Sequence, residues 1–200
     1  MRELTDAQIR EIRKYETIYR EFPRYGLEHG VRREQVEEYL ATLDPAWSLL
    51  DVGCGRGEVL EWAYDLGIQH VYGVEPVYLL RKPNVHCAVA WDLPFEDGIF
   101  DVVTCFDVME HLLEDDAEPT LRELNRVARH QVALTISNRP DQWGVMAGVG
   151  TLHVNLKPYE EWDMLIREHI HGKVERRPGV EHLNEMWVIT REVPDEPDGR

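Results

Sequence analysis

The sequence predicts an α/β protein: a doubly wound, mostly parallel sheet preceded by N-terminal helices. From Ser48 onward, short apolar runs alternate with helical patterns, which is typical of strands and helices that build a parallel sheet. The first run, Leu49–Val52, passes into three glycines at alternate positions and then into a helical pattern. That order lets the main chain approach a ligand at the start of a helix, so we expect a binding site there.

Two helices are expected before the sheet. Apolar and tyrosine side chains recur at three- and four-residue intervals from Thr5 to about Glu21, and Pro23 ends this amphipathic pattern. A second helical pattern runs from about 32 to 43. We therefore expect a helical cap over residues 1–45.

The sheet is expected within a core over residues 46–192, in a single domain that spans 1–200. The tail 193–200 is acidic and contains prolines, so we expect it to be disordered. The remaining pattern predicts strands near 48–52, 70–75, 85–90, 100–106 and 131–137, a helix near 158–168, and a hairpin of runs near 169–176 and 185–192.

The glycine turn has a distinctive composition. Its spacing is Gly53-x-Gly55-x-Gly57, which differs from the G-x-G-x-x-G of dinucleotide sites. Asp51 precedes it by two positions, and the next apolar run ends in Glu75. A carboxylate at the end of the second strand can accept hydrogen bonds from both hydroxyls of a ribose. Together these residues resemble the first two motifs of the class I S-adenosylmethionine-dependent methyltransferases.

This resemblance implies a seven-stranded sheet whose seventh strand is antiparallel, with S-adenosylmethionine as cofactor and S-adenosyl-L-homocysteine as product. A segment similar to the family's D-L-P-F passage places Asp92 at the adenine amino group, with Trp91 and Leu93 against the ring; a carboxylate at a strand end can also simply cap a helix. Asp107 is expected near the sulfonium, which partial negative charge attracts. The implied cofactor-binding residues are Asp51, Gly53, Cys54, Gly55, Gly57, Glu75, Pro76, Trp91, Asp92, Leu93, Phe106 and Asp107.

Two histidines are candidates for catalysis. His111 follows the fourth strand in a Glu-His pair that the family often uses as a packed, hydrogen-bonded structural pair beside the pocket. His153 lies in the stretch 138–158, which has no clear periodicity and is typical of a lid or binding loop. It is the candidate general base, with Asn155 as its orienting partner; the alternative is that both tie the loop to the sheet.

Aromatic residues of the cap are candidates for binding the methyl acceptor. In the family, helices that precede the sheet often cover the cofactor. The alternative is that Tyr15 and Tyr19 simply form the apolar face of their helix. The candidate acceptor pocket consists of Tyr15, Tyr19, Tyr25, His29, Trp143 and Asn155.

The charge and the cysteine content indicate which binding partners and which cellular compartment to expect. The chain has 38 acidic against 22 basic residues, a net charge of −16, which disfavours binding to nucleic acid or anionic membrane. Its three cysteines are expected to be small buried residues in a reducing compartment. Because no Cys or His spacing suits a metal, none is predicted. Without a membrane-length apolar stretch or an apolar signal-peptide core, the protein is expected in the cytoplasm.

The sequence therefore predicts methyl transfer from S-adenosylmethionine to a small-molecule acceptor, by O- or N-methylation, in a monomer or homodimer. Two alternatives stay open: a methyltransferase acting on nucleic acid or protein, and a non-catalytic partner protein that binds S-adenosylmethionine. The segment after the fourth expected strand resembles the family's fourth motif. It reads Phe106-Asp107-Val108-Met109 rather than N/D-P-P-Y/F, which argues against an adenine-directed DNA enzyme.

Overall fold

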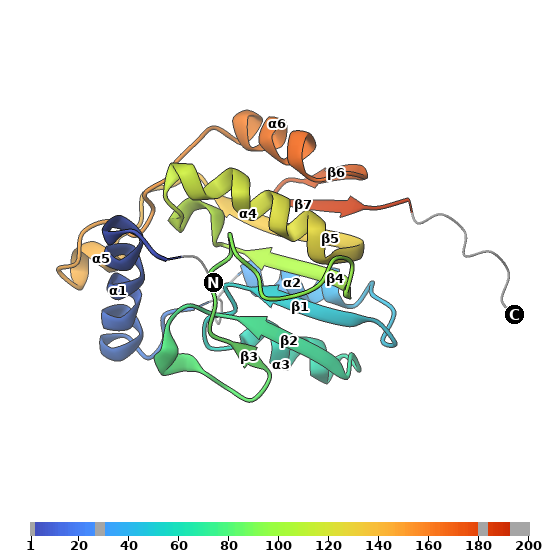
Figure 1. Ribbon diagram of the computed structural model, residues 1–200, viewed down its shortest axis with the longest axis horizontal. Helices are drawn as coiled ribbons and strands as arrows, with labels where there is room; N and C mark the ends of the chain where they lie inside the picture. The colour runs from blue at the N-terminus through green and yellow to red at the C-terminus, as the bar shows by residue number, and fades with distance from the viewer. Residues whose placement is uncertain (1–2, 27–30, 180–183, 193–200) are drawn as a thin grey trace, which may run out of the picture.

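The computed structural model describes residues 3–26, 31–179 and 184–192. Its centre is a seven-stranded sheet with the order β3-β2-β1-β4-β5-β7-β6 (Figure 1). The first five strands pair in parallel, and β7 lies antiparallel between β5 and β6. The strands are β1 Ser48–Val52, β2 His70–Val74, β3 Val85–His86, β4 Phe100–Phe106, β5 Ala128–Ser137, β6 Lys173–Arg177 and β7 Asn184–Thr190. The predicted fold class, including the antiparallel seventh strand, is confirmed.

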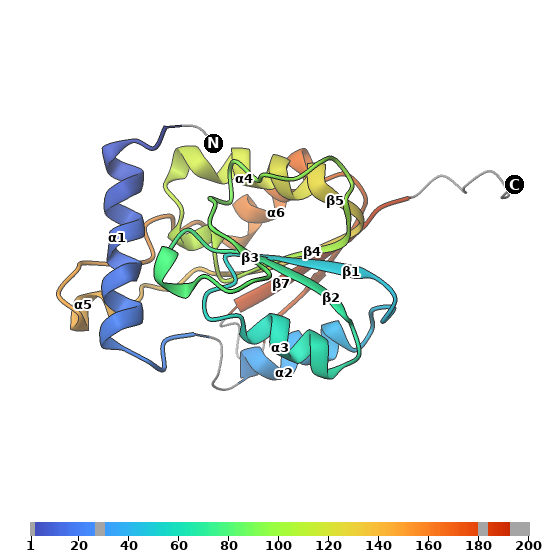
Figure 2. The ribbon, with the colours of Figure 1, turned by 60° about the horizontal axis from the view of Figure 1, so that its bottom comes forward.

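Helices cover both faces of this sheet, as the doubly wound prediction requires. Helices α4 and α6 lie on one face and α2 and α3 on the other (Figure 2). The helices are α1 Asp6–Glu21, α2 Val31–Leu40, α3 Glu58–Asp65, α4 Glu114–Val127, α5 Trp143–Met146 and α6 Tyr159–His169, with short 3-10 turns η1 Tyr78–Leu80 and η2 Met109–His111. In the described part of the chain, no helix combines the length and the apolar character needed to cross a bilayer.

The central strands are buried on both faces, which explains their continuous apolar runs. Successive side chains of a strand point to opposite faces, so Leu50 packs in the cluster under α4 and α6 while Leu49 packs in the cluster with α2 and α3. Trp162 and Trp187 fill the first cluster and are fully buried. These two clusters fix the sheet that positions the site.

Helix α1 stands across the carboxyl ends of the parallel strands, beside α5 (Figures 1 and 2). It begins with a capping box: the Thr5 hydroxyl accepts a hydrogen bond from the Gln8 amide, and the Gln8 side chain accepts one from the Thr5 amide. It ends at Glu21, two residues before Pro23, as the sequence pattern predicts. Only Ile18 of this helix is fully buried, while Tyr15 and Tyr19 are partly buried.

Several element boundaries differ from the prediction. Strand β3 ends at His86 rather than near residue 90, because Val89 turns back to pair with Asp92 in an antiparallel bridge. Strand β5 begins at Ala128, where α4 passes into it without a loop. The predicted disordered tail 193–200 lies outside the described residues.

Candidate functional site

A cavity of about 730 Å³ opens at the carboxyl ends of β1, β2 and β4, between these strands and α1. Parallel strands of an open sheet characteristically form their ligand crevice at this edge. The segment 138–158 supplies part of the outer wall. The sequence-predicted residues that line the cavity are Tyr15, Tyr19, Tyr25, Asp51, Gly53, Cys54, Gly55, Glu75, Pro76, Trp91, Phe106, Asp107, His111, Trp143 and His153.

Four predicted residues lie beside the cavity rather than in its wall. Gly57 starts α3 in the left-handed conformation, with φ of 87°. Leu93 is buried in the core, and Asp92 takes part in the bridge to Val89. Asn155 is buried behind the wall, where its main-chain amide donates a hydrogen bond to the Glu110 carbonyl. His29 is outside the described residues.

The glycine turn requires its glycines. Gly53 and Gly55 have φ of 76° and 51°, in the left-handed region that favours glycine. A Cβ on Gly53 would also lie 2.5 Å from a methyl group of Val108. The amides of Gly53 and Cys54 both donate to the Val74 carbonyl, at 2.8 and 3.0 Å, which fixes the turn against the end of β2.

Glu75 is held in the cavity wall by main-chain amides. Its two carboxylate oxygens accept hydrogen bonds from Gly55 and Val77, each at 3.0 Å. The side chain is almost fully buried, and this burial raises the pKa of Glu75 to about 7, against the lowering effect of the two amides. Burial likewise raises the pKa of Asp51 to about 7, although the Thr104 hydroxyl donates to it at 2.7 Å. Both acids therefore titrate near neutrality.

These raised pKa values predict a pH-dependent stability. The folded protein keeps the protons of Asp51 and Glu75 up to about pH 7, whereas the unfolded chain releases them near pH 4 to 5. The free energy of unfolding should therefore decrease as the pH rises through this interval, and stop decreasing above it. Glu75→Gln removes one of the two titrating groups. The free energy of unfolding of this variant should therefore decrease by roughly 3 kcal/mol less than that of the wild type, at about 1.4 kcal/mol per pKa unit. Urea unfolding at pH 4.5 and 7.5 measures this, and equal decreases in both proteins would contradict it.

Aromatic residues of α1, of the loop after it and of α5 form an aromatic wall of the cavity. The rings of Tyr15, Tyr19 and Tyr25 lie with centroids 5.8–6.3 Å apart, and Trp143 is 6.0 Å from Tyr25. Burial raises the pKa of all three tyrosines, so their hydroxyls stay protonated. Tyr15 and Tyr19 both line the cavity, together with Ile12 of the same helix.

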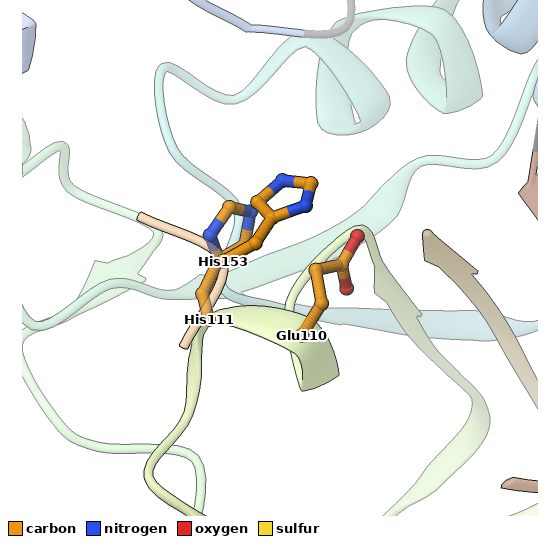
Figure 3. Close-up of side chains that lie close together, drawn as sticks. All are labelled: Glu110, His111 and His153. Atoms are coloured by element: carbon orange, nitrogen blue, oxygen red, sulfur yellow. The ribbon is translucent and has the colours of Figure 1, made fainter. Parts of the chain in front are cut away.

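The two candidate histidines meet at this wall. The centroids of their rings lie 4.6 Å apart, the ring planes are nearly perpendicular, and the carboxylate of Glu110 lies beside both rings (Figure 3). His111 comes from η2, directly after β4, and its Nδ1 lies 2.5 Å from the Tyr15 hydroxyl. His153 comes from the segment 138–158, and its Nδ1 contacts the Arg139 carbonyl.

Solved structures share this fold. A protein from Pyrococcus horikoshii superposes with a TM-score of 0.69 at 18% identity, over 87% of this chain and 98% of that one. A possible histamine N-methyltransferase from Thermotoga maritima, described as dependent on S-adenosylmethionine, gives a TM-score of 0.62 at 20% identity, over 90% of this chain and 99% of that one.

The sequence of the core matches a known family of domains. Residues 50–136 match the family described as a methyltransferase domain. The core of this chain therefore resembles methyltransferase domains, and the structure has the fold of the class I S-adenosylmethionine-dependent methyltransferases. This match and this fold imply S-adenosylmethionine as the cofactor of this methyltransferase domain. A curated mouse relative, eEF1A lysine and N-terminal methyltransferase, is 26% identical over 111 residues, which is 50% of this chain and 16% of that protein.

Asp107 has an unusual backbone conformation. It directly follows β4 with φ of 53°, in the left-handed region that residues other than glycine rarely adopt. Its Oδ1 accepts hydrogen bonds from the Thr135 hydroxyl at 2.9 Å and the Asn184 side chain at 2.5 Å. Neighbouring strands thus hold the carboxylate at the edge of the cavity.

Sequence reasoning missed several residues of the methyltransferase cavity. Asn184 comes from β7, and only the long-range pairing of β5 with β7 brings it to Asp107. Arg56 occupies a variable position of the glycine motif, yet its guanidinium donates to the Tyr19 carbonyl at 2.7 Å and so joins α1 to the turn. Asp141 accepts hydrogen bonds from three amides of the 138–158 segment, which a local turn pattern could have suggested.

One cysteine prediction is wrong. Cys54 and Cys105 are buried, and burial raises the pKa of both thiols. Cys87 is exposed instead. The reason is the shortness of β3, which ends one residue earlier and leaves Cys87 beyond the sheet.

Proposed function

We propose that this methyltransferase transfers the methyl group of S-adenosylmethionine to a small-molecule acceptor bound in the outer part of the cavity. The observation that carries the proposal is the continuity of one cavity from the glycine turn and Glu75 to the aromatic wall and the two histidines. A volume of about 730 Å³ lies within the range of small-molecule sites, roughly 300–1,000 Å³.

The residues of the inner end fit the cofactor. The turn at Gly53 and Gly55 provides main chain without Cβ atoms, and Glu75 provides carboxylate oxygens for the ribose hydroxyls. Trp91 offers an apolar surface for the adenine, while the side chains of Asp51 and Asp107 bring carboxyl groups toward the methionine end. When bound, S-adenosylmethionine supplies the electrophilic methyl group.

The outer end orients the acceptor and takes its proton. Tyr15, Tyr25 and Trp143 provide apolar surface that aligns an acceptor with the methyl group, and alignment alone supplies much of the acceleration of a displacement. His153 is the proposed base for a hydroxyl acceptor. The Arg139 carbonyl can only accept a hydrogen bond, so it places the ring proton on Nδ1 and the lone pair on Nε2.

A protein acceptor is the second candidate function, because the curated mouse relative is named as a lysine and N-terminal methyltransferase. A lysine side chain could enter the same aromatic end of the cavity. The acidic net charge of −16 would favour a basic peptide over nucleic acid.

Labelling experiments distinguish these candidates. Purified protein is incubated with isotope-labelled S-adenosylmethionine and cell extract, and the label is followed by mass spectrometry in the small-molecule, protein and nucleic-acid fractions. Label in a small molecule supports the proposal, and label in a protein supports the second candidate. Cofactor binding measured by calorimetry without any labelled product would identify a non-catalytic partner protein.

Gly53→Ala gives a specific test of the cofactor end. The new methyl group would meet Val108 at 2.5 Å on a backbone with positive φ, so we expect the affinity for S-adenosylmethionine to fall at least ~10-fold. Gly98→Ala is the matched control, since Gly98 also has positive φ, 60°, but its Cβ would meet no atom within 4 Å. Calorimetry should show weaker binding in the first variant alone; equal affinities would contradict the assignment.

A further inference from the structure

We propose that Glu110, His111 and His153 form a binding site for a divalent transition-metal ion in the wall of the cavity. Their ligand atoms all lie within 4.8 Å of one another (Figure 3). Two ligands on opposite sides of an ion at about 2.1 Å are separated by roughly 4.2 Å. Small side-chain rotations would therefore bring the three groups into the coordination sphere of one ion.

The donor set selects the type of ion. Two imidazole nitrogens and one carboxylate oxygen suit Zn²⁺, Mn²⁺, Fe²⁺ or Co²⁺, whereas Ca²⁺ and Mg²⁺ prefer ligands that are all oxygen. The spacing of these residues in the sequence did not indicate a metal site, because His153 follows His111 by about forty positions and approaches it only in the folded chain.

Hydrogen bonds to the main chain orient both imidazole rings as metal ligands. Nδ1 of His153 contacts the Arg139 carbonyl, and Nδ1 of His111 lies 3.1 Å from the Leu152 carbonyl and 2.5 Å from the Tyr15 hydroxyl. Carbonyl oxygens only accept, so a proton on Nδ1 satisfies these contacts. The lone pair then lies on Nε2 of each ring, and this arrangement is the usual one for histidines that bind metal.

The carboxylate is fixed in the same way. Glu110 is fully buried, and one of its oxygens accepts a hydrogen bond from the Ser137 amide at 2.9 Å. Burying a carboxylate is costly unless it is hydrogen-bonded or binds a cation. The nearby carboxylates of Asp107 and Asp141 add negative charge to this end of the cavity: together with Glu110, they contribute, after burial, to the raised pKa of Tyr25.

Main-chain contacts hold the two halves of the cluster together. The carbonyl of Glu110 accepts hydrogen bonds from the amides of Val154 and Asn155, both at 3.0 Å. These bonds hold the two residues that follow His153 against η2, the element that carries Glu110 and His111. A preformed arrangement of this kind reduces the entropy that is lost when an ion binds.

The site would face the acceptor. His111 and His153 line the cavity, while Glu110 lies behind them. Three protein ligands leave a coordination position open, as at catalytic metal sites. On the basis of the proposed function, that position would take an oxygen of the acceptor, whose hydroxyl would ionise more readily on the metal and release its proton to solvent. His153, with Nε2 bound to the ion, would then be a ligand rather than the base.

Metal titration of the full-length protein tests the proposal. Protein freed of metal with a chelator is titrated with Co²⁺ followed by visible absorption, and with Zn²⁺ and Mn²⁺ by calorimetry. We expect one ion per chain. His111→Ala and His153→Ala should each weaken its binding at least ~10-fold. His171→Ala, which removes an exposed histidine elsewhere, should leave binding unchanged.

A second measurement does not depend on the variants folding. Paramagnetic Mn²⁺ should broaden the imidazole signals of His111 and His153 in the NMR spectrum of the wild-type protein before those of other histidines. Absence of binding at millimolar Co²⁺, or binding that both alanine variants retain, would overturn the proposal. Calorimetry with S-adenosylmethionine on the same sample separates this outcome from a failure of the proposed function, because the cofactor would still bind.

Discussion

Replacing His153 by alanine is expected to lower the turnover of this methyltransferase by ~10²–10⁴-fold, the usual effect of losing a positioned base. The ring lies in the cavity wall with its Nδ1 held by the Arg139 carbonyl, so Nε2 can accept a proton from the acceptor. Affinity for S-adenosylmethionine should barely change, because the residues proposed to hold it belong to the opposite end of the cavity. Initial rates with the acceptor found by labelling, together with calorimetry, measure both quantities.

Chelator treatment separates the two roles that His153 can have. If the side chain acts only as a base, removing metal leaves the wild-type rate unchanged. If it binds an ion that activates the acceptor, the chelator lowers the wild-type rate toward that of His153→Ala. His171→Ala should behave as wild type. Unchanged turnover in His153→Ala, or a loss of cofactor affinity as large as the loss of turnover, would show that the histidine only fastens the loop.

Glu75→Ala is expected to have the largest effect on cofactor binding. Above pH 7, where Glu75 is ionised, a hydrogen bond to its carboxylate contributes about 1.5–3 kcal/mol, so losing one weakens S-adenosylmethionine binding by roughly 10- to 150-fold. The substitution also leaves the amides of Gly55 and Val77 without the carboxylate that orders the turn. Calorimetry on protein with an unchanged circular dichroism spectrum measures the loss.

Two variants provide the comparison. Glu61→Ala removes an exposed carboxylate of α3 that pairs with Lys82, and it should leave affinity unchanged. Asp92→Ala should have a smaller effect than Glu75→Ala, since Asp92 lies beside the cavity and adenine can also pack on Trp91. A change of less than threefold in Glu75→Ala would assign Glu75 a purely structural role at the end of β2.

The fold could be predicted because its strongest determinants are local. The run Leu49–Val52 alone indicates a strand buried on both faces, and the glycines that follow it fix the turn and the cavity edge. Glu75 could be placed because carboxyl ends of parallel strands meet at one edge. Each of these features can be recognised within a short stretch of sequence.

The remaining features depend on contacts between distant segments. The length of β3 was overestimated because the bridge between Val89 and Asp92, rather than the apolar run, ends it. Asn184 reaches Asp107 only through the antiparallel register of β7. The approach of His153 to Glu110 depends on amide–carbonyl bonds, and main-chain groups give no signal in a side-chain pattern.

The position of α1 has a consequence for how such proteins diversify. The family match covers residues 50–136, whereas α1 and the segment 138–158 lie outside it and still form the outer wall. Since Ile18 is the one fully buried residue of α1, most of this helix can change without disturbing the core. Under the proposed function, mutations in these two segments would alter the choice of acceptor and leave the glycine turn and Glu75 unchanged. Exchanging these two segments between relatives would be a route to new specificities.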